Sequence, residues 1–397
     1  QWFPDQQPAK SKFEMSTTIV GHRYDTGESV EVTISNGIIS AIQSITESEA
    51  TLPVIAPGFV DLQINGYGGQ EFNDLELSVD DVRRVSVQMD VDGVTTYLPT
   101  LTSQSYEMMH HAFSVMNDAL STDADVQRRV TGFHMEGPYM SAEDGPRGAH
   151  PVQHMRPPDW DEFCRLQEAA GGNIKILTMS PEYDGSAEFI TKVANSGVLV
   201  SIGHTSANSD QIKAAVDAGA RMSTHLGNGA HRQIRRHPNY LWDQLADDRL
   251  VASLIVDGHH LPAEVVKVFM RCKGVDGAVL VSDITGMAGM PPGLYENNSI
   301  GGVEVLDDGR LVVPGQRQLL AGASLPIGVG IAKIMEYAGL SLKDAVELAS
   351  MRPAALIGCE CGALQVGDPA DLCTFTLDNG TLEVQSTINR GEIVFQR

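Results

Sequence analysis

Residues 57–69, PGFVDLQINGYGG, and residues 198–205, VLVSIGHT, show the pattern that decides the fold of this chain. In each, an apolar run ends in polar side chains. Eight such runs occur, and a stretch with helical character usually follows. They span residues 54–65, 95–100, 129–137, 173–182, 198–205, 220–228, 251–260 and 278–283. Eight buried strands alternating with helices are typical of a closed parallel (β/α)8 (TIM) barrel.

Helix-start signals between the runs support this pattern. Ser78 precedes the spacing Val82–Val85–Met89, and Asn208 precedes DQIKAAVDAG. We expect further helices to begin at Pro262, Ser341 and Pro353. A doubly wound open sheet is the alternative architecture. No G-x-G-x-x-G stretch follows the first strand to favour it.

The two ends of the chain differ from the middle. Asn36-Gly37 separates two apolar runs, which is a strong hairpin signal, and residues 361–397 alternate short β runs with turns. We therefore predict a small β-sandwich domain built from residues 15–56 and 361–397, around a barrel of residues 57–360. Residues 284–320, with an Asp308-Gly309 turn, are interpreted as a loop or hairpin over the barrel mouth.

Composition narrows the range of partners. The chain has 397 residues and a formal net charge of -23, which disfavours nucleic acid and anionic membranes as partners. No apolar run approaches the ~18 residues of a membrane-spanning helix, and residues 1–14 lack the apolar core of a signal peptide. We treat those residues as an extension ahead of Met15. A phosphate ester substrate would need a local cationic pocket.

Cysteine usage indicates a reduced, cytoplasmic setting. The five cysteines are odd in number, and a chain of this size needs no disulfide framework. Cys359 and Cys361 form a C-x-C pair, but no second pair or nearby histidine completes a zinc site. We interpret them as ordinary residues at a helix end.

The polar residues at the strand ends carry the chemistry. In a parallel barrel these ends meet at one rim, where active sites lie. They bring Gln63, Asn65, Glu136, His204, His225, Asn228, His260 and Asp283 to that rim. One carboxylate and two imidazoles form a typical catalytic zinc set that leaves a position open for water. Asp283 could exchange a proton with that water.

Taken one at a time, these residues are weak evidence. A single histidine near a strand end is more often a hydrogen-bonded structural residue, and an aspartate after a strand is more often a helix N-cap. Because several such residues occur together at the ends of successive strands, a shared functional site is the favoured interpretation. His134 lies two residues before Glu136 on the same face of its strand, so it could support that carboxylate.

Across residues 19–395 the chain resembles the N-acetylglucosamine-6-phosphate deacetylases of the amidohydrolase superfamily. The resemblance rests on an ordered set of motifs: PGFVDLQINGYGG at 57–69, HMEGPY at 134–139, GHT at 203–205, THLGNGA at 224–230, DGHH at 257–260, VSD at 281–283, AGASL at 321–325 and GDPADL at 367–372. It implies metal-dependent hydrolysis of an acetamido group on a phosphosugar, in amino-sugar catabolism, by a homodimer.

The resemblance also assigns roles by position. Glu136, His204 and His225 match the metal ligands, and Asp283 matches the catalytic carboxylate. His150 matches a histidine near the reacting centre. The other matching positions are implied to bind substrate: Gln63, Asn65, Asn228, Gly229, Arg236 and His260.

Two departures from the family pattern matter. Gln63-Ile64-Asn65 replaces the H-x-H of many superfamily members, so we expect one divalent ion rather than two. One glutamate and two histidines suit Zn²⁺, and Fe²⁺, Co²⁺ or Mn²⁺ could substitute for it. Asn228-Gly229-Ala230 replaces a common N-A-M, and Arg232 and Arg235 compete with Arg236 for the phosphate.

Three alternatives stay open at this point. The substrate could be N-acetylgalactosamine 6-phosphate or another acylated amino sugar. The chain could catalyse another amidohydrolase reaction, such as cyclic amide opening. It could also be a sugar-phosphate-binding barrel that has lost its chemistry.

Overall fold

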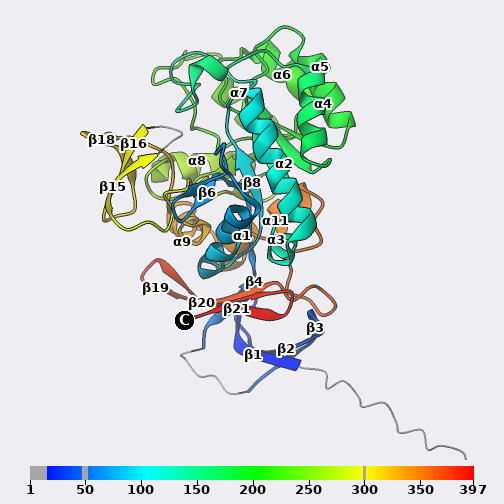
Figure 1. Cartoon of the computed structure of the whole chain (residues 1–397). Helices are drawn as coiled ribbons and strands as arrows, with labels where there is room; N and C mark the ends of the chain where they lie inside the picture. Colours follow the sequence, from blue (N-terminus) through cyan, green and yellow to red (C-terminus); the bar gives the residue numbers. More distant parts are fainter. Residues whose placement is uncertain (1–15, 47–51, 298–300) are drawn as a thin grey trace, which may run out of the picture.

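The computed structural model describes residues 16–46, 52–297 and 301–397, and a parallel barrel forms its centre (Figure 1). The sheet order is β14-β13-β12-β11-β10-β9-β8-β5. A parallel bridge between Ile64 and Ile284 joins the two ends of this sheet. The predicted (β/α)8 barrel is thus confirmed. Its strands are β5 (Phe59–Ile64), β8 (Val94–Leu101), β9 (Phe133–Glu136), β10 (Ile174–Met179), β11 (Leu199–Ile202), β12 (Met222–Ser223), β13 (Val251–Leu254) and β14 (Ala278–Leu280).

Helices surround the barrel and begin close to the predicted positions. The Ser78 and Asn208 side chains accept hydrogen bonds from the backbone at Asp81 and Gln211, which caps α1 and α6. Pro353 lies inside the last helix and does not start it. The helices are α1 (Val79–Gln88), α2 (Tyr106–Thr122), α3 (Ala124–Arg129), α4 (Trp160–Ala169), α5 (Ser186–Asn195), α6 (Ser209–Ala218), α7 (Tyr240–Ala246), α8 (Ala263–Lys273), α9 (Ile327–Ala338), α10 (Leu342–Glu347) and α11 (Met351–Leu356).

A buried apolar cluster fills the interior of the barrel. It takes side chains from several barrel strands and from α11, including Val60, Leu98, Ile176 and Ala354. Burying such side chains supplies most of the driving force for closure, at roughly 25 cal/mol per Å² of apolar surface. The apolar lower interior leaves the polar chemistry to the opposite rim.

The C-x-C pair packs against this interior cluster, and here the expectation was wrong. Cys359 and Cys361 are joined in a disulfide, whereas we expected a reduced setting and ordinary residues at a helix end. The reason is local geometry. Past the end of α11 the chain brings their Cα atoms to 5.5 Å, a separation that a disulfide can bridge.

Strands from both chain ends form the predicted small β-sandwich, built on a seven-stranded sheet beneath the barrel in Figure 1. Asn36 and Gly37 both have positive φ, 54° and 78°, as a two-residue type I′ hairpin turn requires. The run 54–65 contains two strands and not one, because β4 pairs with this sheet and β5 with the barrel. The strands are β1 (Ser16–Arg23), β2 (Ser29–Ser35), β3 (Ile38–Ser44), β4 (Val54–Pro57), β19 (Leu372–Asp378), β20 (Thr381–Asn389) and β21 (Glu392–Gln396).

The segment after β14 is more ordered than a loop or single hairpin. It forms a four-stranded antiparallel sheet of β15 (Gly293–Asn297), β16 (Gly301–Val305), β17 (Leu311–Val313) and β18 (Gln316–Leu320). Val303, Val305 and Leu311 give it a small apolar core of its own. The residues that follow β18 reach the edge of the barrel pocket.

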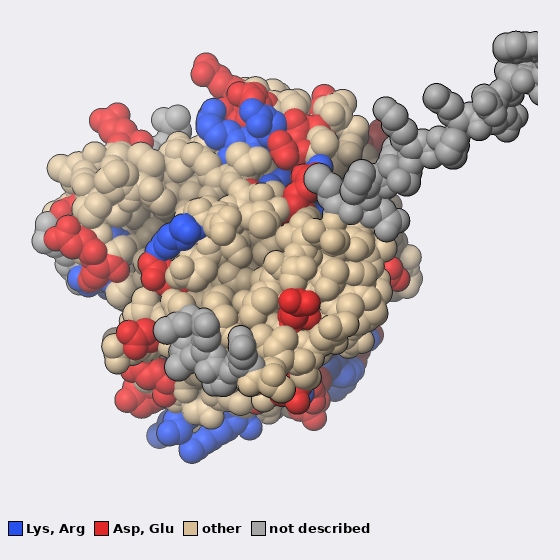
Figure 2. All heavy atoms as spheres, turned by 90° about the horizontal axis from the view of Figure 1, so that it is seen from below, with Lys and Arg blue, Asp and Glu red and all other residues tan. Residues whose placement is uncertain are grey.

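Surface charge is mixed on the face shown in Figure 2. There, the described Lys and Arg side chains form small groups close to Asp and Glu, and the centre of the face carries few charges. Among the described residues, no helix is long and apolar enough to cross a membrane. The proposed start at Met15 lies outside the described residues.

Candidate metal and substrate site

A pocket of about 530 Å³ lies at the carboxyl ends of the barrel strands. Nine of the predicted site residues line it: Asn65, Glu136, His150, His204, His225, Asn228, Gly229, His260 and Asp283. Gln63 and Arg236 are not among the lining residues. Arg232, which we considered beside Arg236 as a phosphate ligand, does line the pocket.

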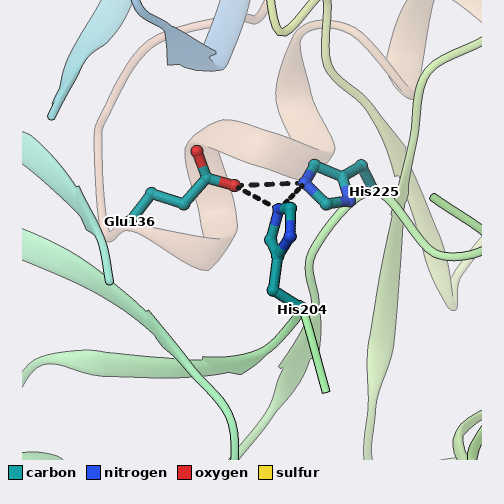
Figure 3. Close-up of side chains that lie close together, drawn as sticks. All are labelled: Glu136, His204 and His225. Atoms are coloured by element: carbon teal, nitrogen blue, oxygen red, sulfur yellow. Dashed lines mark hydrogen bonds and ion pairs between the residues drawn. The ribbon is translucent and has the colours of Figure 1, made fainter. Parts of the chain in front are cut away.

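Glu136, His204 and His225 converge on one point (Figure 3). Glu136 Oε1 lies 3.3 Å from His204 Nε2 and 3.1 Å from His225 Nε2, and the two nitrogens are 3.0 Å apart. Ligands about 2.1 Å from a tetrahedral zinc ion would be roughly 3.4 Å apart. The triangle therefore has nearly the size that a shared cation requires.

The contacts of the His204 ring show that its Nε2 suits a bound cation better than a hydrogen bond to Glu136. Its Nδ1 lies 2.7 Å from the carbonyl oxygen of Pro146, which can only accept, so Nδ1 carries the proton. In the neutral ring, Nε2 then directs a lone pair toward Glu136 Oε1, another acceptor. Burial opposes ionisation of Glu136, but its contacts with the two imidazoles hold its pKa well below the ordinary value. This set of facing donor atoms fits a divalent ion.

The backbone is strained where it presents the site. His204, His225 and Asp283 have positive φ values of 48°, 29° and 54°, a region that residues other than glycine rarely adopt. Such strain is typical of functional sites, where the surrounding structure holds a side chain in a required direction. Here it aims the side chain at the end of each strand into the rim.

Asp283 is buried beside the candidate metal site. Burial and the nearby Glu136 carboxylate raise its pKa to about 6. Asn65 Nδ2 donates to Asp283 Oδ1 at 2.8 Å, and Asp283 N–H donates to the Gln63 carbonyl. Asn65, expected to bind substrate, is therefore engaged in orienting the carboxylate.

His150 is held as a neutral hydrogen-bond donor. The backbone N–H of Ser103 donates to His150 Nδ1 at 3.3 Å, so the ring proton lies on Nε2. Burial, followed by the nearby His204, lowers the pKa of His150 to about 3. The ring lies edge-on to His204, with centroids 4.4 Å apart. Its Nε2 can donate to a ligand oxygen next to the candidate metal ligands.

His260 has a defined orientation as well. Its Nδ1 lies 2.7 Å from Asp257 Oδ2, which leaves Nε2 for a ligand in the pocket. Burial alone would raise the pKa of Asp257, but the hydrogen bond and charge of His260, together with the backbone N–H groups of His260 and His259, lower the pKa to about 2. Asp257 thus stays ionised and holds the ring in place.

The three candidate arginines lie in different places. Arg232 lines the pocket, and no other arginine or lysine does so among the described residues. Arg235 lines a separate pocket of about 270 Å³ beside Asn208 and Tyr240. Arg236 is exposed, and its carbonyl accepts a hydrogen bond from Asn239.

The Gln63 side chain is buried without a hydrogen-bond partner among the described residues, whereas Gly229 is limited by its close approach to His204. The Gln63 side chain is 1% exposed, and neither its oxygen nor its nitrogen has a partner within the described chain. Gly229 has φ 55°, and a Cβ there would lie 2.7 Å from His204 Nδ1. The loop after β12 therefore needs glycine to pass this close to His204, a candidate metal ligand.

Sequence reasoning missed several supporting residues. Pro146 and Ser103 orient His204 and His150, and Asp257 orients His260. Pro146 acts through its backbone carbonyl, which leaves no trace in side-chain chemistry, and Ser103 acts through its backbone N–H and through Oγ, which lies 2.9 Å from His150 Nδ1. Asp257 had a visible signal, because an Asp-Gly-His-His turn at a strand end places a carboxylate within reach of an imidazole.

Comparisons with known proteins agree with this geometry. Residues 54–394 match the model of the amidohydrolase family. The N-acetylglucosamine-6-phosphate deacetylase of Bacillus subtilis is 32% identical over 86% of this chain and 85% of its own length. The N-acetylgalactosamine-6-phosphate deacetylase of Escherichia coli O157:H7 is 28% identical over 91% of this chain and 94% of its own.

A solved structure matches nearly the whole chain. It is a mutant N-acetyl-D-glucosamine-6-phosphate deacetylase from Mycobacterium smegmatis, in complex with N-acetyl-D-glucosamine-6-phosphate. It is 27% identical and has a TM-score of 0.84, with 96% of this chain and 100% of that chain covered. From its barrel, its Glu-His-His cluster and these matches, the chain belongs to the amidohydrolase family, whose members hydrolyse with a divalent metal ion.

Proposed function

We propose that the chain removes the acetyl group from N-acetylglucosamine 6-phosphate, giving glucosamine 6-phosphate and acetate. The observation that carries the proposal is the convergence of three ligand atoms within 4.8 Å of one another, in a pocket that also holds Asp283 and His150. The deacetylase relatives supply the substrate class.

We infer that Glu136, His204 and His225 hold one Zn²⁺. A carboxylate and two imidazoles suit zinc, while the amides of Gln63 and Asn65 are poor zinc ligands. When bound, such an ion supplies a Lewis acid and lowers the pKa of a coordinated water to about 7. Fe²⁺, Co²⁺ and Mn²⁺ could fill the same donor set.

The chain's own groups would then handle the protons and the carbonyl. Ionised Asp283 accepts a proton from the attacking water and later delivers it to the leaving nitrogen of the sugar. His150 donates from Nε2 to the acetyl oxygen as negative charge develops on it. Because Asn65 holds Asp283 Oδ1, the carboxylate is already oriented before substrate binds.

The phosphate end of the substrate would lie toward His260 and Arg232. A guanidinium can bond two phosphate oxygens at once, and its charge offsets the carboxylates around the pocket. Asn228 and Gly229, on the same loop as Arg232, would bind the phosphate with amide and backbone groups. The assignment of Arg236 to the phosphate stays a prediction.

Acetate release tests the proposed function directly. Purified protein is assayed with N-acetylglucosamine 6-phosphate and with the unphosphorylated sugar, before and after chelator treatment. We expect acetate and free amine from the phosphosugar, strong discrimination against the unphosphorylated sugar, and loss of turnover with chelator. Chelator-resistant turnover, or equal turnover of both sugars, would contradict the proposal.

N-acetylgalactosamine 6-phosphate is the second candidate substrate. The Escherichia coli relative, named for that substrate, matches 91% of this chain. The two sugars differ only in the orientation of one hydroxyl, so parallel measurements of kcat/KM on both decide between them.

We further propose that the enzyme is a homodimer, as the family resemblance implies. Light scattering after size-exclusion chromatography would give twice the 42.7 kDa mass of the chain. A mass of one chain at assay concentrations would contradict it.

A further inference from the structure

A chain of buried hydroxyl groups lies inside the barrel beneath the candidate metal ligands. Ser201 Oγ lies 2.5 Å from Thr224 Oγ1, which lies 2.6 Å from Thr178 Oγ1. Thr178 Oγ1 in turn lies 2.7 Å from His134 Nε2, and His134 Nδ1 lies 3.0 Å from the Leu62 carbonyl oxygen. All four side chains are at most 3% exposed.

The chain can run in only one direction. The Leu62 carbonyl can only accept, so His134 Nδ1 donates to it, and Nε2 of the neutral ring must accept from Thr178. The single Thr178 proton is then used, so Thr178 accepts from Thr224. By the same logic Thr224 accepts from Ser201. Each hydroxyl proton therefore has a single acceptor in this chain, and the directions of all the hydrogen bonds are fixed.

This chain connects the strands that carry the metal ligands. His134 lies two residues before Glu136 on β9, and Thr178 is opposite Glu136 in the β9–β10 register. Ser201 lies on β11, three residues before His204. Thr224 directly precedes His225.

Side-chain bonds add to the backbone pairing at β12, the shortest strand of the barrel. This strand has only two residues, and each of its two neighbours pairs with it through only two residue pairs. Beyond Ser223 the backbone N–H groups of Thr224 and Leu226 still donate to the Ile202 and Ser253 carbonyls, and the N–H of His225 donates to the Ser253 hydroxyl. The Thr224–Thr178 bond then links the end of β12 to β10, across the intervening strand β11.

The neighbouring glycine makes room for this link. A Cβ at Gly203 would lie 2.8 Å from Thr178 Cγ2 and 2.9 Å from Thr224 Cβ. Both contacts are closer than real Cβ atoms tolerate. Glycine at position 203 therefore leaves the space in which Thr178 and Thr224 form their hydrogen bond.

We propose that this hydroxyl chain is a positioning device, which sets the spacing of Glu136, His204 and His225 so that a divalent ion binds tightly. The proposal rests on the metal site of the proposed function, although its test needs no substrate. Groups that orient metal ligands typically contribute about 10- to 100-fold in metal affinity or activity.

The test compares two substitutions at Thr178, of which one removes the hydroxyl and the other keeps it. Thr178→Val removes the hydroxyl and keeps the branched shape, whereas Thr178→Ser keeps the hydroxyl. Zinc dissociation constants of the purified proteins are measured by competition with a chromophoric chelator. We expect Thr178→Val to weaken zinc binding by about 10- to 100-fold. Thr178→Ser should restore affinity close to wild type.

A matched control separates positioning from general loss of a buried hydrogen bond. Ser86 is also fully buried and bonds the Tyr97 hydroxyl at 2.8 Å, on α1 and β8. Ser86→Ala should lower the thermal midpoint without changing zinc affinity. Wild-type zinc affinity in Thr178→Val would overturn the proposal, as would equal weakening in Thr178→Ser or Ser86→Ala.

A milder variant keeps the proposal testable if Thr178→Val does not fold. Ser201→Ala removes only the terminal donor of the chain and should weaken zinc binding several-fold. Unchanged affinity there would then overturn the proposal. If the wild-type protein binds zinc but releases no acetate from either phosphosugar, the proposed function fails while this inference stands.

Discussion

Replacing Asp283 by asparagine separates the proton chemistry from metal binding. The substitution keeps the size of the side chain, and its amide oxygen can still accept the hydrogen bond that Asn65 donates to Asp283 Oδ1. It removes the group that accepts and returns a proton. General acid–base groups contribute roughly 10²–10⁴-fold to rate, which corresponds to about 3 to 5 kcal/mol of barrier.

The assay for Asp283→Asn pairs turnover with metal content. We expect kcat for acetate release to fall by about 10²- to 10⁴-fold, while zinc still binds at one ion per chain. Glu136→Gln is the control, because it should lose metal and turnover together. Near-normal turnover by Asp283→Asn, or loss of its zinc, would refute the assignment of Asp283 as the proton carrier.

The pH profile of the wild-type protein gives an independent check on Asp283. Burial and the Glu136 carboxylate raise the pKa of Asp283 to about 6 in the metal-free site, and a bound cation acts in the opposite direction, because it favours the charged form. The base must be ionised to work, so kcat/KM should rise with pH through a limb at or below about 6. A limb well above pH 7 would contradict this account.

Three further outcomes follow from the same geometry. Arg232→Ala should lower kcat/KM for the phosphosugar by about 10- to 100-fold, as loss of a charged hydrogen bond predicts, and Arg236→Ala should lower it less. The reverse order would favour Arg236 as the phosphate ligand. Gly229→Ala should weaken zinc binding, because its Cβ would press on His204, whereas Gly172→Ala, at a positive φ in open space, should not. Removing the metal should lower the thermal midpoint, and zinc at 100 times its dissociation constant should restore about 3 kcal/mol, as measured by calorimetry.

The barrel and the rim residues could be predicted because both follow from local patterns. Each strand shows as an apolar run, and parallel strands place their carboxyl ends at one rim. His204, His225 and Asp283 were thus brought together without knowledge of any loop. Backbone strain at these three positions could not be foreseen, because it depends on the strand and the loop together.

Where the expectations differed, the deciding contacts are long-range. β4 and β5 lie in one apolar run, and the pairing of Val54–Pro57 with β1 and β19 places that part in the small sheet. The Cys359–Cys361 bond depends on how the chain leaves α11. The loop after β12 has no periodicity, so nothing in the sequence distinguished Arg232 from its neighbours.

The proposed chemistry depends on one divalent ion held by Glu136, His204 and His225. Crystals grown with zinc, with diffraction recorded at the zinc absorption edge, test it most directly. We expect one anomalous peak per chain, about 2.0–2.2 Å from Glu136 Oε1 and from each Nε2. A peak centred elsewhere, a second peak of equal height beside Gln63 and Asn65, or no peak at the three ligands would contradict it.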